Sequence, residues 1–194
     1  MTEQLFKWPL IVIDFEASAL ATEAYPIEVG IAVADKPTTE PFVWSTLIKP
    51  DSSWNIDQQW DSDAERIHCI KRWDLRDGFS PREVMIELNR RIPKGATVWC
   101  DGGHYDEAWL KALCLASNVI PNFEMHDLTL VWQREAHTRD AYLQMLATTR
   151  PVHRAGPDSQ RILKTLCLLY LSSQPPSPHA ESRALPASGD GHLA

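Results

Sequence analysis

The sequence lacks the features of a membrane protein and of a structural zinc site. No apolar run approaches the length needed to span a bilayer. Its four cysteines form no CxxC pair, and structural zinc sites usually draw their ligands from such closely spaced pairs. Cys100, Cys114 and Cys167 lie among apolar residues, so we expect small core side chains rather than metal ligands.

The sequence also lacks an excess of basic residues. Its formal net charge of −7 argues against broad electrostatic binding to nucleic acid. It does not exclude an enzyme acting on nucleic acid, because acidic metal ligands contribute to that charge. The N-terminus has no basic region, and residues 10–13 are too short for a signal-peptide core. We therefore expect a cytoplasmic protein.

Clustered acidic residues are present instead. They occur in three segments that are far apart in the sequence: Asp14 with Glu16, Asp101 with Asp106, and Asp158 with His153. Carboxylates brought into one pocket would repel one another unless cations lay between them. The pattern therefore predicts a metal-dependent enzyme if the fold brings these segments together.

The hydrophobic pattern predicts one α/β domain over residues 1–172. A buried strand is expected at 9–15, with Asp14 and Glu16 on the same face because side chains alternate along a strand. Further strands are expected at 27–34, 41–48, 96–100 and 123–128, and the short links between the first three favour an antiparallel meander.

Helices are predicted between and after these strands. Ser80 to Glu83 forms a capping box with proline at the first helical position, and it opens a helix to about residue 92. Other helices are expected near 63–70 and at 106–117 and 139–149, and a last one enters at Gly156-Pro157 and runs to residue 171, with Asp158 in its first turn. Residues 173–194 are rich in Pro, Ser, Ala and Gly and are predicted to be a disordered tail.

Taken in order, these segments resemble the motifs of the DEDD exonuclease superfamily. The first motif is matched by Asp14-x-Glu16 and the PIEVGIA run that follows at residues 26–32. Asp106, followed by Ala-Trp-Leu, resembles the second motif. His153-x4-Asp158 resembles the third motif in its histidine-bearing DEDDh form, which occurs in proofreading subunits, RNase T and oligoribonuclease.

The resemblance implies an RNase H-like fold, a mixed five-stranded sheet flanked by helices, and a 3′–5′ exonuclease that releases nucleoside 5′-monophosphates. Oxygen ligands suit two Mg²⁺ or Mn²⁺ ions rather than zinc. In the family pattern, Asp14, Glu16 and Asp158 hold one ion, while Asp14 and Asp106 support the second. His153 is then the general base, a role that suits histidine because it titrates near neutral pH.

The resemblance also implies contacts to single-stranded nucleic acid 3′ ends. In the family, the loop after the first motif meets the terminal nucleotide, which places substrate contacts at Phe15, Ser18, Ala19 and Leu20. His68 lies in a segment that resembles the family's HGI element, with Cys69 in the position of the glycine. Phe15 is equally expected in the core, because it faces away from Asp14.

Several alternatives stay open at the level of sequence. Asp101 is interpreted as a loop-capping residue in preference to a metal ligand. Trp54, Trp60 and Trp73 are expected in a satellite core or a homodimer face in preference to stacking on bases. The runner-up function is a catalytically silent nucleic-acid or protein-binding module on the same fold, and a third is a phosphodiesterase of small nucleotides.

Overall fold

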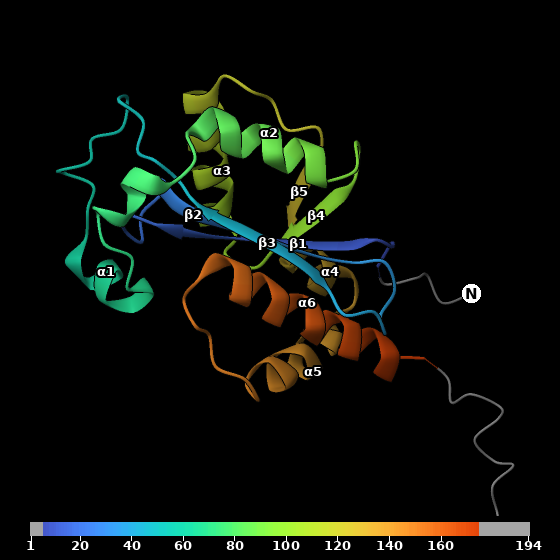
Figure 1. Ribbon diagram of the computed structural model, residues 1–194. Helices are drawn as coiled ribbons and strands as arrows, with labels where there is room; N and C mark the ends of the chain where they lie inside the picture. Colours follow the sequence, from blue (N-terminus) through green and yellow to red (C-terminus); the bar gives the residue numbers. More distant parts are fainter. Residues whose placement is uncertain (1–5, 175–194) are drawn as a thin grey trace, which may run out of the picture.

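The computed structural model describes residues 6–174, except for the side chains of Ala136 and His137 (Figure 1). The predicted tail at 173–194 therefore lies almost entirely outside the described residues. Among those residues, no helix is both long enough and apolar enough to cross a membrane.

A five-stranded mixed sheet forms the centre of the molecule, with the strand order β3-β2-β1-β4-β5. The strands are β1 (Leu10–Ala17), β2 (Pro26–Ala34), β3 (Phe42–Leu47), β4 (Thr97–Cys100) and β5 (Glu124–Asp127). β1 pairs antiparallel with β2, and β2 pairs antiparallel with β3, which confirms the predicted meander. β4 lies parallel to both β1 and β5. The continuous apolar run of β1 fits its central position, where both faces are covered.

Helices cover both faces of this sheet (Figure 1). One face carries α2 (Pro81–Arg91) and α3 (His104–Ser117), and the other carries α4 (Thr129–Arg134), α5 (Ala136–Leu146) and α6 (Ala155–Ser172). α1 (Ser62–His68) and a 3₁₀ turn at Asp74–Asp77 lie beside one end of the sheet. The two faces of β1 thereby enter separate hydrophobic clusters, one with α2 and α3 and one with α4 to α6.

The helix predictions were largely confirmed, with three differences. The capping box is complete, because the Ser80 hydroxyl accepts from the Glu83 amide and the Glu83 carboxylate accepts from the Ser80 amide. α4 was missed because it spans only six residues, too few to show a helical period. α5 begins and ends three residues before the predicted 139–149. α6 begins at Ala155, one residue before the predicted entry at Gly156-Pro157, and Pro157 fits within its first helical turn.

The tryptophans of the irregular middle segment divide into two kinds. Trp54 stacks on Tyr25 with ring centroids 5.1 Å apart, and the Trp60 ring meets His68 edge-on at 6.2 Å. Both pack against a small satellite core around Tyr25. Trp73 is exposed and does not join it.

Candidate active site

Asp14 and Glu16 lie at the carboxyl end of β1, on the face that α6 covers. The start of α6 reaches this point because Gly30 of β2, the register partner of Asp14, has no side chain. A Cβ atom at Gly30 would lie 2.2 Å from the carbonyl carbon of Ala155. Close backbone packing at a glycine thus delivers Asp158, in the first turn of α6, to the two acids of β1.

Asp106 approaches from the other side of the sheet, in the first turn of α3. Asp106 is 1% exposed, and its carboxylate accepts a hydrogen bond from the Gly102 amide at 3.0 Å. A side chain at position 102 would collide with that carboxylate, since a Cβ atom there would lie 2.6 Å from Asp106 Oδ2. The Gly102-Gly103 pair that ends β4 therefore shapes the loop around Asp106.

The acids form two overlapping groups of three. Single carboxylate oxygens of Asp14, Glu16 and Asp158 lie within 4.8 Å of one another, and so do those of Asp14, Asp101 and Asp106. Asp14 belongs to both groups. Asp101, which the sequence placed in a loop-capping role, thus stands beside two of the expected ligands. The structure brings together all four acids of the expected ligand set.

The electrostatics of the group are those of crowded carboxylates. Burial, and then the charges of Asp106 and Glu16, raise the pKa of Asp14 well above its ordinary value. Burial, and then the charge of Glu28, raise the pKa of Glu16 to about 8. Burial, and then the charge of Asp101, raise the pKa of Asp106 to about 7. Desolvation by the surrounding protein raises the pKa of Asp101 to about 6. Such a site favours protons or cations between its oxygens.

His153 lies on the loop that precedes α6 and is exposed, in a left-handed backbone conformation with φ of 57°. The Asp158 carboxylate accepts hydrogen bonds from the amides of Val152 at 3.0 Å, His153 at 2.7 Å and Arg154 at 3.3 Å. The four-residue spacer between His153 and Asp158 thus lets the acid fold back on the loop and fix the histidine beside it.

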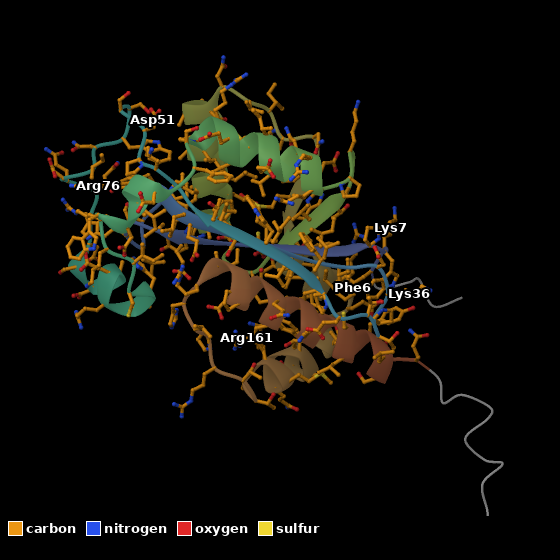
Figure 2. All side chains as sticks on the ribbon, viewed as in Figure 1. Phe6, Lys7, Lys36, Asp51, Arg76 and Arg161 are labelled. Atoms are coloured by element: carbon orange, nitrogen blue, oxygen red, sulfur yellow. The ribbon has the colours of Figure 1, made fainter. Side chains whose placement is uncertain are left out.

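These residues line a cavity of about 530 Å³. One wall is made by α1 and its N-cap residue, with Asp61, Asp63 and Ile67, while Tyr105 and Trp109 line the cavity from α3. His153 and Arg161 also line the cavity. Arg161 is labelled in Figure 2, where it lies between α6 and α5, and its guanidinium donates to the carbonyl oxygens of Leu146 and Thr149.

Four of the five residues expected to contact substrate line this cavity. Leu20 is 72% exposed at its edge, Ala19 is half-buried, and Phe15 is buried in the core, as its orientation on β1 predicts. Ser18 is different, because its buried hydroxyl accepts a hydrogen bond from the Tyr25 amide and its side chain does not line the cavity. Ser18 closes the loop that presents Ala19 and Leu20.

His68, the last of the four that line the cavity, lies at the end of α1 and is 3% exposed. Its Nδ1 accepts a hydrogen bond from the Ile70 amide at 3.0 Å, so in the neutral ring Nε2 carries the proton. Within the described residues, Nε2 has no hydrogen-bond partner. Burial lowers the pKa of His68 and keeps the ring neutral. Cys69 follows with φ of 58°, a backbone conformation that explains why glycine suits this position.

Sequence reasoning missed several residues around the cavity. Among them are Tyr105, Trp109 and Arg161. Helical spacing could have indicated two of these, because Trp109 stands three residues after Asp106 and Arg161 three after Asp158. The α1 wall gave no such signal, because it depends on how a long irregular segment folds back over the sheet.

Comparisons with known proteins give likenesses in structure alone. No protein-family model matches the chain, and no curated protein matches it in sequence. The fold resembles E. coli exonuclease I in a zinc-bound complex with single-stranded DNA, with a TM-score of 0.66 and 12% identity over 84% of this chain. The chain spans only 40% of that bacterial enzyme.

Two further solved structures are 3′-exonucleases. One, from work on recognition of the histone mRNA stem-loop 3′ end, has a TM-score of 0.66 and 12% identity, covering 89% of this chain and 67% of that one. The other, a full-length 3′-exonuclease, has a TM-score of 0.64 and 15% identity, covering 84% and 81%. The predicted RNase H-like architecture, a mixed five-stranded sheet flanked by helices, is confirmed.

Proposed function

We propose that this protein is a DEDDh-type, metal-dependent 3′–5′ exonuclease that releases nucleoside 5′-monophosphates from single-stranded DNA or RNA. The observation that carries the proposal is the pair of carboxylate groups that share Asp14. They stand in one cavity with His153, on a fold that resembles 3′-exonucleases.

The donor set fits two divalent cations. Each group offers three carboxylates with oxygens within 4.8 Å of one another. In each group, burial and then repulsion between neighbouring acids raise the pKa of at least two members. Oxygen-only ligands of this kind suit Mg²⁺ or Mn²⁺. Asp14, Glu16 and Asp158 would hold one ion, and Asp14 with Asp106 the other, with Asp101 beside it. Bound ions supply neutralisation of the phosphate charge and activation of the attacking water.

The chain's own residues supply orientation and proton transfer. His153 accepts the proton of the attacking water at one of its ring nitrogens, and the hydrogen bonds from its loop to Asp158 keep the ring beside the acids. The buried His68 Nε2–H, which has no partner among residues 6–174, lies on the cavity wall and bonds an acceptor oxygen of the terminal nucleotide. Leu20 packs its exposed side chain against the last base.

The cavity favours ends over long tracts of polymer. Its volume of about 530 Å³ is that of a site for a single small ligand, which suits one terminal nucleotide. Asp61 on the α1 wall would repel a phosphate chain that continued past it, whereas the charge of Asp63 is paired with Arg66. With a net charge of −7, the chain matches short substrates or overhangs better than long strands.

Degradation of 5′-labelled oligonucleotides tests this proposal. Purified protein with Mg²⁺ or Mn²⁺ should convert a linear DNA or RNA oligomer into a ladder that shortens from the 3′ end, and EDTA should stop the reaction. A covalently closed circle of the same sequence should stay intact, because it has no 3′ end. Cleavage of the circle, or a ladder that persists in EDTA, would contradict the proposal; the polymer that yields the ladder identifies the substrate.

A further inference from the structure

The loop that carries His153 is anchored to β2 as well as to Asp158. Glu28 of β2 is 2% exposed and accepts hydrogen bonds from Arg154 Nε at 2.9 Å and Arg154 Nη2 at 2.7 Å. The same carboxylate accepts from the Ala155 amide at 3.0 Å. Glu28 therefore fixes the side chain and the backbone that immediately follow the histidine, with the two-point geometry that arginine and carboxylate prefer.

The position of Glu28 in the sheet ties this anchor to the acids. Glu28 is the register partner of Glu16 on β1, and two residues later Gly30 is the partner of Asp14 and receives the backbone of Ala155. The strand that pairs with the first acidic motif thus also holds the start of α6. One segment of sheet sets the distance between the acids of β1 and the residues of the third motif.

We propose that Glu28 and Arg154 are positioning residues, which hold His153 and Asp158 in place against Asp14 and Glu16. This inference rests on the proposed exonuclease activity. Arg154 also offsets the charge of two carboxylates that face each other on neighbouring strands, Glu16 and Glu28. Neither positioning residue needs to touch the substrate, and Glu28 is too deeply buried to reach it.

Substitution of Glu28 tests the inference. Glu28→Gln keeps the size of the side chain but replaces one acceptor oxygen with an NH₂ group, which cannot accept from Arg154. We expect kcat to fall roughly 10–100-fold, the range seen when a group that orients a catalytic side chain is lost, while KM for a DNA or RNA oligomer changes less than about threefold. Arg154→Lys, which keeps the charge but loses the two-point contact, should retain more activity than Arg154→Ala.

A second readout does not depend on catalysis. Hydrogen exchange at the His153 and Ala155 amides should speed up at least about tenfold in Glu28→Gln, because exchange reports the local opening of the loop. Glu40→Gln is the matched control. It removes an exposed ion pair, 2.6 Å long, between Glu40, which precedes β3, and Lys164 of α6. It should change neither kcat nor the exchange rates of the two amides.

The outcomes separate the inference from the proposed function. Lower thermal stability in Glu28→Gln with unchanged kcat and unchanged exchange at residues 153–155 would overturn the positioning role, and so would a fall in kcat without faster exchange. If Glu28→Gln does not fold, the comparison of Arg154→Lys with Arg154→Ala decides by the same two readouts. An inactive wild-type protein would refute the exonuclease proposal, whereas the exchange measurement would still decide whether Glu28 anchors the loop.

Discussion

Replacing Asp14 with asparagine is expected to lower exonuclease activity by roughly 10³-fold or more, while the metal-free protein becomes more stable. Asp14 belongs to both carboxylate groups, so its loss removes a ligand from each. The reacting phosphate would lose several kcal/mol of charge stabilisation, and each ~1.4 kcal/mol is a factor of ten in rate. Stability should rise because burial, and then the charges of neighbouring acids, make Asp14 costly to ionise in the folded protein, and asparagine removes that cost.

Two measurements check this result: the rate of oligomer degradation, and the melting temperature in EDTA. Asp35→Asn is the matched control, because Asp35 is an exposed carboxylate that follows β2 at the end of the sheet remote from the cavity. It should leave both quantities unchanged. Asp14→Asn with nearly full activity would contradict the site.

Asp158 is a less direct test than Asp14, for a reason that only the structure shows. An alanine at position 158 would remove a metal ligand and also leave the amides of residues 152–154 without their acceptor. Loss of activity in Asp158→Ala would therefore combine two effects. This carboxylate belongs to the acid cluster and also holds the loop together.

The second large effect concerns pH and metal ions. The pKa values of Glu16, Asp106 and Asp101 are raised from ordinary values near 4 to about 8, 7 and 6. These groups are more easily protonated in the folded state, so their contribution to stability is full at low pH and is lost as pH rises through the raised values. Metal-free protein should therefore become less stable between about pH 5 and pH 8.

Divalent cations should reverse that loss. They bind the ionised carboxylates, so Mn²⁺ should raise the melting temperature by roughly 5–10 °C at pH 8 when its concentration is about 100 times the dissociation constant. The increase should be much smaller at pH 5, where protons compete for the same oxygens. Thermal melts at several pH values, with Mn²⁺ or EDTA, measure both trends. A metal-free protein that gains stability toward pH 8 would contradict the raised pKa values.

The sequence predicted the sheet and the acids well because both depend on short-range signals. A run as short and as rich in β-branched residues as 10–13 favours a buried strand, and alternation then puts Asp14 and Glu16 on one face. The complete capping box at Ser80 shows the same principle for α2. The order and spacing of the acidic segments predicted one shared site, and the fold brings their side chains into one cavity.

What the sequence could not give depends on contacts between distant segments. The pairing of Glu28 with Arg154 joins residues 126 positions apart, and no periodicity points to it. Asp101 was ranked as a loop residue because a carboxylate before two glycines is typical of a turn, and only the position of α3 shows that it stands beside Asp106. The buried hydroxyl of Ser18 depends in the same way on the return of the chain at Tyr25.

The number of Mn²⁺ ions that the protein binds is the sharpest test of a two-ion site that shares Asp14. We expect the wild-type protein, titrated with Mn²⁺ at pH 8 in the presence of a nucleoside 5′-monophosphate and followed by electron paramagnetic resonance, to bind two ions. Asp14→Asn should lose both, and Asp35→Asn should keep both. A wild-type protein that binds no Mn²⁺ at millimolar concentration, or an Asp14→Asn variant that still binds two ions, would contradict this two-ion site.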